Sequence, residues 1–278
     1  MSPVQKSVWY IECFLHSELS LERLARAVGV SPCHLTRAFG AATGRSVMRY
    51  VRHRRLSWAA TQLAAGRQDL LDLALELGYQ SHGAFSRAFR EQFGLSPDRI
   101  RRQGHVHTIN LQEPLRMEAS HAVELAEPHF VDHPGMRIAG LSRHYSYESS
   151  AQIPGQWAEF NALAGTFAGR SGDDAFGVIS EAASDGSFEY LTGVPVTSLS
   201  GVDDRMAVLT LAPQRYAVFS SSEHVAALRA VMHAIWSSWL PRSGVRVSDA
   251  PMLERYGASF DPATGSGGFE LWIPLASD

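Results

Sequence analysis

The fold of the first third of the chain is decided by residues 73–94, which read LALELGYQSHGAFSRAFREQFG. The second part of this stretch, residues 81–94, matches residues 31–44, fifty positions earlier, with five identical residues. These are Ser31, Arg37, Ala38, Phe39 and Gly44, which recur as Ser81, Arg87, Ala88, Phe89 and Gly94. In the first copy Gly29 supplies the positive φ of a tight turn, and Ser31 can cap a helix that starts at Pro32. The chain therefore contains two predicted helix-turn-helix units.

The second helix of each unit has a face suited to reading DNA. Apolar residues fall on one side at about 100° per residue, and small or polar residues fall on the other. Arginine can pair bidentately with guanine in a major groove, and small neighbours let the helix backbone approach closely. We expect Arg37 and Arg87 to point outward in this way. A merely solvated surface arginine is the alternative for either residue alone, and the repetition argues against it.

Residues 73–97, followed by Arg101 and Arg102, resemble the signature of the AraC/XylS family of bacterial transcription regulators. The resemblance covers roughly residues 5–104 and implies an all-α domain that binds the major groove of double-stranded DNA. Positions that match the family's base-reading residues, or share their outer face, are Cys33, Thr36, Arg37, His82, Gly83, Ser86, Arg87 and Arg90. Family members often carry a larger side chain where Cys33 stands, so their target sequence cannot be transferred.

A long helix over residues 46–65 is expected to connect the two units. If both recognition helices enter successive major grooves, they must lie about 34 Å apart. A spacer that misses this distance bends the DNA, at roughly 1 to 6 kcal/mol, or leaves one unit loosely engaged. Two units in one chain also make a monomer sufficient for a two-groove site.

Charge divides the 278 residues into two parts. Through His105 there are 15 Lys and Arg against 8 Asp and Glu, whereas the remainder has 10 against 20. The basic part suits a phosphate backbone, which would repel the acidic part. The sequence therefore predicts a DNA-binding domain at 5–104, a linker at 105–121, where Pro114 interrupts an aperiodic stretch, and a domain of different function at 122–278.

Cysteine and histidine usage supports neither a disulfide framework nor a metal site. The cysteines are Cys13 and Cys33, and no Cys-x-x-Cys pair exists. His105 and His107 lack a third ligand at a defined spacing, so a surface pair is the better interpretation. Cys33 lies in the first turn of a helix, whose dipole is expected to lower its thiol pKa; a redox switch is conceivable, but a small residue near DNA is favoured. No export signal or apolar span is present, and we expect a bacterial cytoplasmic protein without metal, cofactor or membrane contact.

A second duplication follows Pro134. Two segments repeat a strand, a tryptophan-bearing helix and further strands, at 137–141, 156–160 and 186–196, and again at 215–219, 235–239 and 268–274. These halves predict an α+β domain, an antiparallel sheet with helices on one side. The arrangement resembles the GyrI-like effector domain over about residues 122–278, which implies a cleft for apolar or cationic small molecules against aromatic rings and a buried glutamate.

The acidic domain contains the residues that such a cleft needs. Aromatic faces attract a cation by roughly 0.5 to 2 kcal/mol each, and a buried carboxylate needs a positively charged partner. The candidates are Tyr145, Trp157, Glu189, Tyr190, Trp239, Glu254 and Tyr256. Most aromatic residues of a small sheet domain form its core, and an exposed or locally paired carboxylate is the alternative for either glutamate.

Three functions remain open at the level of the sequence. The first is a DNA-binding transcription regulator that senses a small apolar or cationic effector through its second domain, and is not an enzyme. The second is a hydrolase, or a domain that sequesters a toxic small molecule, with Glu189 beside Tyr190 or Glu254 beside Tyr256 as general base. The third is a module that docks a protein such as RNA polymerase, in which case side chains should fill the cleft.

Overall fold

The computed structural model describes residues 2–66, 69–115, 125–163, 169–183, 185–198 and 205–276. Apart from its first two residues, the chain forms two compact units, one of residues 3–32 and 46–120 and one of residues 33–45 and 121–278. The end of the predicted linker, residues 116–121, and the predicted start of the second domain at residue 122 lie outside the described residues.

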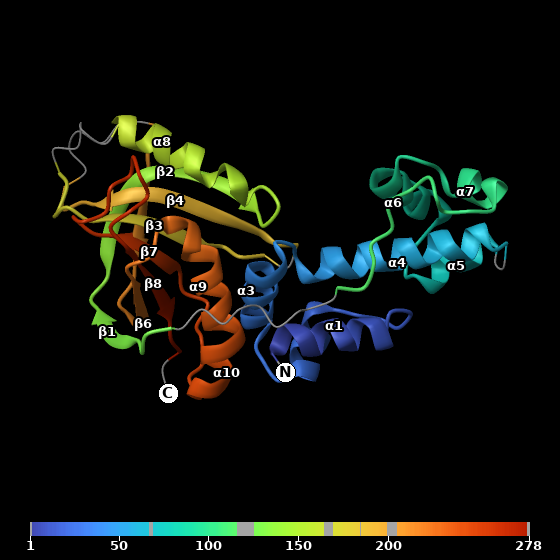
Figure 1. The fold of residues 1–278 in the computed structure, drawn as a ribbon, viewed down its shortest axis with the longest axis horizontal. Coiled ribbons are helices and arrows are strands. Elements are labelled where there is room, and N and C mark those ends of the chain that lie inside the picture. Colours follow the sequence, from blue (N-terminus) through green and yellow to red (C-terminus); the bar gives the residue numbers. More distant parts are fainter. Residues whose placement is uncertain are drawn as a thin grey trace. The chain divides into compact units, whose positions relative to one another are not determined.

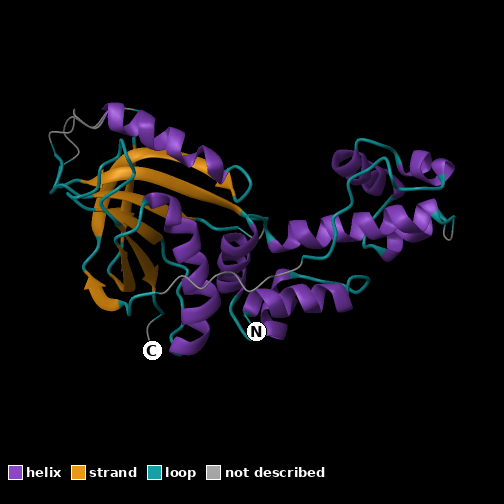
Figure 2. Ribbon diagram, viewed as in Figure 1, coloured by secondary structure: helices purple, strands orange, loops and turns teal. Residues whose placement is uncertain are grey.

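The first unit is helical (Figures 1 and 2). Its helices are α1 (Pro3–Cys13), α2 (Leu21–Val28), α4 (Val47–Ala64), α5 (Leu70–Glu76), α6 (His82–Phe93) and α7 (Pro97–Gln103). Ser20 and Ser81 cap α2 and α6, because their hydroxyls accept hydrogen bonds from the backbone N–H groups of Arg23 and Ala84. The turns pass through Gly29 and Gly78, with φ of 79° and 80°. The long connecting helix is α4.

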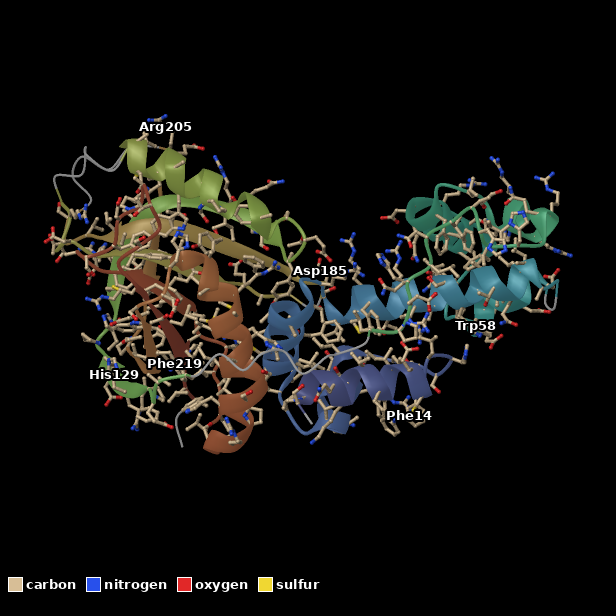
Figure 3. All side chains as sticks on the ribbon, in the orientation of Figure 1. Phe14, Trp58, His129, Asp185, Arg205 and Phe219 are labelled. Atoms are coloured by element: carbon tan, nitrogen blue, oxygen red, sulfur yellow. The ribbon has the colours of Figure 1, made fainter. Side chains whose placement is uncertain are left out.

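One apolar cluster holds α4 to α7 together. Leu56, Phe85, Phe89 and Ile100 are fully buried in it, and the ring of Trp58, labelled in Figure 3, packs against it. Val106, Ile109 and Leu111 also pack against this cluster. The first part of the predicted linker therefore contributes to the packing of the first unit.

The second unit contains α3 (Pro32–Thr43) and a sheet of eight strands. The strands are β1 (His129–His133), β2 (Met136–Ser146), β3 (Ala175–Ser180), β4 (Ser187–Pro195), β5 (Ala207–Leu211), β6 (Gln214–Ser221), β7 (Met252–Tyr256) and β8 (Phe269–Pro274). Their order is β1-β6-β8-β7-β3-β4-β2-β5, and all these neighbours pair antiparallel. This predicted α+β class is confirmed.

The strand order reads the same from either edge once β2, β3, β4 and β5 are matched to β6, β7, β8 and β1. Between β2 and β3 lie a short 3-10 turn (Ser150–Gln152) and α8 (Ile153–Leu163). Between β6 and β7 lie a 3-10 turn (Val225–Ala227), α9 (Leu228–Ala234), the π-helical turn η4 (Ile235–Trp239) and α10 (Leu240–Ser243). The duplication predicted from the sequence is therefore present, and β3 and β7 meet at its centre.

Both faces of the sheet are apolar. On the face that packs against α8, which we call the helix face, Leu141 and Val194 contact Phe160 of that helix. The opposite face contains a separate cluster that includes Ile138, Val178, Leu191, Leu253 and Trp272. Because successive side chains of a strand alternate between faces, this arrangement fixes which residues of β4 and β7 can reach α8.

Candidate functional site

The second recognition helix, α6, presents an accessible face. His82, Gly83, Arg87 and Arg90 are exposed, whereas Ser86 is buried and lies with its Oγ 3.4 Å from Nε2 of His82. The two arginines project from the side opposite the buried Phe85 and Phe89. The outward orientation expected for this copy of the motif agrees with the structure, and its role in base reading remains a prediction.

The first recognition helix, α3, differs from its copy. Thr36 and Arg37 are only 3% and 5% exposed. One guanidinium N–H of Arg37 donates to the carbonyl oxygen of Ala250 over 3.2 Å, and its central carbon lies 6.0 Å from the ring centroid of Trp236. The expectation of an outward Arg37 is therefore wrong in this structure. Helical periodicity marks a face that avoids the core of its own motif, but cannot tell whether solvent or protein covers it.

Cys33 does not have the activated thiol that its place at a helix start suggests. Burial raises the pKa of this thiol to about 11, and the nearby positive charge of Arg37 only partly offsets it. The expected lowering is wrong, because the loss of hydration on burial is the largest effect on this thiol and Asp249 raises its pKa further. A redox switch at Cys33 is disfavoured.

In the second unit, Glu254 is a buried carboxylate held by two phenols. The hydroxyls of Tyr190 and Tyr256 donate to its Oε2 over 2.5 Å and 3.0 Å. The indole N–H of Trp157 in turn donates to the Tyr190 hydroxyl over 3.0 Å. These four residues, which we call the acid cluster, come from α8, β4 and β7. Of the two candidate glutamates, Glu254 is therefore the buried one, and it accepts hydrogen bonds from two of the candidate tyrosines, whereas its role in a ligand site stays a prediction.

Gln156 fastens α8 to the sheet beside the acid cluster. Its side chain is fully buried and donates to the carbonyl oxygens of Leu141 and Tyr190 and to Oγ1 of Thr192. Its Oε1 accepts from the hydroxyl of Tyr145 over 2.8 Å. Tyr145 therefore stabilises Gln156 by a hydrogen bond. Gln156 in turn fixes the position on α8 of the next residue, Trp157.

Burial dominates the electrostatics of the acid cluster. It raises the pKa of the Glu254 carboxyl, while hydrogen bonds from Tyr190 and Tyr256 act in the opposite direction. Burial and the adjacent Glu254 also raise the pKa of both phenols far above the usual range. The two tyrosines therefore remain neutral donors, and Glu254 is an acid whose ionisation is costly unless a positive charge accompanies it.

An aromatic cavity of about 190 Å³ adjoins the acid cluster. Trp157 and Tyr256 belong to both, and their ring centroids lie 5.0 Å apart in an edge-to-face arrangement. Phe160 and Phe260 line the same cavity, and Arg170 and Asp173 bring charge to its wall. The cavity therefore offers aromatic surface next to a buried acid.

Two candidate residues lie away from the acid cluster. Glu189 belongs to the opposite face from Tyr190, and its carboxylate accepts a hydrogen bond from the Ser142 hydroxyl. Trp239 belongs to η4, in the other half of the duplicated domain, and packs against Phe219 of β6 with ring centroids 4.9 Å apart; Figure 3 labels Phe219. The pairing of Glu189 with Tyr190 as a site is contradicted, because adjacent residues of a strand face opposite ways.

Gln156 and Gly177 are functional candidates that the sequence analysis missed. Neither residue type suggests chemistry by itself. Glu254, by contrast, could be recognised from the sequence as a neighbour of Tyr256. The two residues are two positions apart on a strand, so their side chains must lie on the same face of the sheet.

The part of the chain that the structure describes contains neither a metal-ligand cluster nor a membrane-spanning helix. Across residues 2–66, 69–115 and the later described ranges, no group of three His, Cys, Asp or Glu side chains could hold a metal ion. His105 and His107 stack with ring centroids 5.5 Å apart. None of the described helices has the length and apolarity required to span a bilayer.

Both parts of the chain match known protein families. Residues 24–103 match a helix-turn-helix domain, and residues 126–276 match the GyrI-like small molecule binding domain. The chain belongs to the AraC-type helix-turn-helix proteins and carries a GyrI-like domain. Regulatory protein SoxS of Escherichia coli K12 is 34% identical over 98 residues, which are 35% of this chain and 92% of SoxS.

A relative with a longer match is transcriptional regulator Rob of Salmonella typhimurium. It is 33% identical over 139 residues, covering 50% of this chain and 47% of Rob. The chain therefore spans about half the length of this relative.

Solved structures resemble each part separately. The structure of SAV2435 bound to tetraphenylphosphonium is 20% identical, with a TM-score of 0.45 over 55% of this chain and 95% of its own. The DNA-binding domain of AdpA in complex with a target DNA is 25% identical, with a TM-score of 0.35 over 37% of this chain and 93% of its own.

Proposed function

We propose that this protein is a transcription regulator that binds double-stranded DNA through its helix-turn-helix units and senses a hydrophobic cation through its GyrI-like domain. The observation that carries the sensor role is the buried Glu254 beneath two tyrosine hydroxyls, beside an aromatic cavity. The exposed Arg87 and Arg90 on α6 support the DNA-binding role.

A cation suits the acid cluster for an electrostatic reason. Removing a carboxylate from water is costly, and the phenols of Tyr190 and Tyr256 return only part of its hydration. A positive charge close to Glu254 would stabilise the ionised form, and the faces of Trp157 and Phe260 would add cation–π attraction. A ligand with an apolar body and one positive charge matches both features.

The cavity also favours a small molecule over a protein partner as the occupant of this site. A module that only docks RNA polymerase is expected to fill the corresponding cleft with its own side chains. Here a space of about 190 Å³ adjoins Trp157 and Tyr256. Polymerase contact through another surface is a separate proposal that this site does not support.

Ligand binding can alter DNA binding only if it favours one state of the protein over another. An effector that prefers the DNA-competent state raises DNA affinity by the ratio of its own affinities for the two states. By linkage, DNA must then raise effector affinity by the same factor. This reciprocity separates a sensor from a domain that sequesters a molecule without signalling.

The proposal is tested by titrating the full chain with tetraphenylphosphonium while tryptophan fluorescence and DNA binding are recorded. We expect saturable quenching, because Trp157 lines the cavity, and a change in affinity for a DNA site selected from a random pool. A neutral ligand of similar shape, tetraphenylmethane made soluble by a neutral substituent, is the control. No response of fluorescence or DNA binding to a broad panel of hydrophobic cations would contradict the sensor role.

Cation binding is expected to weaken as pH falls. Burial raises the pKa of Glu254, so its carboxylate becomes protonated at a higher pH than an exposed glutamate. Below that pKa, affinity for a permanent cation should fall by up to about tenfold per pH unit, because binding then requires loss of a proton. Calorimetric titrations from pH 4 to pH 9 measure this slope. An affinity independent of pH over the whole range would show that Glu254 does not pair with the cation.

A further inference from the structure

Gly177 of β3 lies directly against the acid cluster. It pairs across the sheet with Glu254 of β7. A Cβ atom added at Gly177 would stand 2.2 Å from the hydroxyl oxygen of Tyr190 and 2.7 Å from Oε2 of Glu254. Real Cβ atoms do not approach other heavy atoms this closely, so even alanine would displace the two groups that form the 2.5 Å hydrogen bond.

The backbone does not explain why glycine stands at this position. Gly177 is absent from the described glycines with positive φ, which include Gly172 and Gly186 in the neighbouring turns. An ordinary strand residue would satisfy its backbone torsions, and glycine weakens a strand by leaving nothing to pack. Glycine is therefore required at position 177 because a larger side chain would not fit there.

The duplication explains why the space lies at this point. β3 and β7 are matching strands of the two halves and pair at the centre of the sheet. Gly177 and Glu254 face each other across that pair, so both point to the helix face at almost the same place. A large side chain at both positions would compete for one volume. In one half of the duplicated domain β7 carries the carboxylate of Glu254. In the other half β3 has glycine at the paired position and leaves the space that this carboxylate occupies.

We propose that Gly177 is a positioning residue of the ligand site, which keeps open the space in which Tyr190 and Glu254 meet. The assignment rests on the proposed function as far as ligand affinity is concerned, whereas the steric coupling of Gly177 to Tyr190 does not depend on it. The acid and one phenol come from β7, the other phenol from β4 and the indole of Trp157 from α8, so the cluster spans the centre of the sheet beside this glycine.

The test compares Gly177→Ala with the unaltered full chain, and uses Gly155→Ala as the matched control. Gly155 lies exposed on α8, has no positive φ, and an added Cβ there meets nothing within 4 Å. We expect Gly177→Ala to weaken tetraphenylphosphonium binding by about tenfold or more, since overpacking must move Glu254 or Tyr190. Gly155→Ala should leave the affinity unchanged.

The pH dependence of cation binding provides a second measurement. A general loosening of the domain would not shift the midpoint of this dependence. Hydrogen bonds from Tyr190 and Tyr256 lower the pKa of Glu254 against the effect of burial. If Gly177→Ala separates Tyr190 from Glu254, one of these donors is lost, and the midpoint of pH-dependent cation binding must move to higher pH. An unchanged midpoint with unchanged affinity overturns the proposal for Gly177 while leaving the ligand-binding role intact.

A double-mutant cycle on unfolding decides the matter without a ligand. Tyr190→Phe removes the hydroxyl oxygen, the atom closest to an alanine Cβ at position 177, and leaves the longer contacts to Oε2 of Glu254 at 2.7 Å and to Cζ of the ring at 2.8 Å. We expect this change to cost stability in the unaltered chain, where it breaks hydrogen bonds, and to cost less or to stabilise in the Gly177→Ala background. If Gly177→Ala alone fails to fold, recovery of folding by the double variant supports the proposal. Additive effects, or a double variant no better folded than the single one, overturn it.

If the unaltered chain binds no hydrophobic cation, the proposed function fails, and the unfolding cycle still decides whether Gly177 is sterically coupled to Tyr190.

Discussion

Glu254→Gln is expected to lower the affinity for a hydrophobic cation by about 30-fold or more. Removing one partner of a buried, hydrogen-bonded charge pair costs roughly 2 kcal/mol or more, and every 1.4 kcal/mol is about tenfold in affinity. Glutamine has the same shape and keeps a carbonyl oxygen that Tyr190 and Tyr256 can donate to. The loss should therefore come from charge and not from collapse of the site. Isothermal titration of the full chain measures it.

Glu189→Gln is the matched control for this experiment. It makes the same chemical change one residue before Tyr190, on the opposite face of the sheet, where Glu189 bonds to Ser142. Its cation affinity should equal that of the unaltered chain. Equal losses in both variants would indicate a general effect of the domain's negative charge, and no loss in Glu254→Gln would remove Glu254 from the binding site.

The same pair of variants tests catalysis by the GyrI-like domain. An acid with a raised pKa beside two phenols is also suited to proton transfer, so the hydrolase alternative depends on the same residue. Loss of turnover with ligand binding retained in Glu254→Gln would favour an enzyme. Loss of ligand binding, with no product formed by the unaltered chain, would favour the sensor.

Arg87→Ala is expected to weaken specific DNA binding by about 5- to 150-fold. A bidentate arginine–guanine pair contributes roughly 1 to 3 kcal/mol of discrimination against a wrong base. Arg87 is exposed on α6, so its removal should leave the free energy of unfolding nearly unchanged. Affinities for a selected DNA site and for an unrelated duplex, measured at a fixed salt concentration, give the change in discrimination.

Two further variants separate base reading from simple charge. Arg26→Ala removes an exposed arginine of α2 and should weaken the selected and the unrelated duplex to a similar extent. Arg87→Lys keeps the positive charge but cannot form the bidentate pair, so discrimination should fall while binding to unrelated DNA is retained. If Arg87→Ala loses affinity for both duplexes equally, Arg87 contacts only phosphates.

Arg37→Ala is a less direct test of the first recognition helix. In this structure Arg37 is buried and donates to the carbonyl of Ala250, so its removal also changes the packing of the second unit. Its effect on DNA binding must be compared with its effect on unfolding. If both Arg37→Ala and Arg87→Ala leave affinity for the selected site unchanged, the assigned reading faces are wrong.

Local patterns in the sequence determined the helix-turn-helix units and the duplicated domain. Gly29 and Gly78 mark turns that need positive φ, Ser20 and Ser81 satisfy helix N-termini, and the two halves of the sheet repeat a strand–helix–strand order. These features depend on neighbours a few residues apart, so they can be recognised before the chain folds. The spacing of Glu254 and Tyr256 by two residues belongs to the same class of information.

Only the tertiary structure decided which groups meet and which are covered. The acid cluster joins Trp157, Tyr190 and Glu254 from three elements, and the pairing of β3 with β7 sets Gly177 against them. Arg37 and Arg87 occupy the same place in a repeated motif, yet one is buried and the other exposed. The physical reason is that contact, burial and pKa depend on residues distant in the sequence, which local periodicity does not contain.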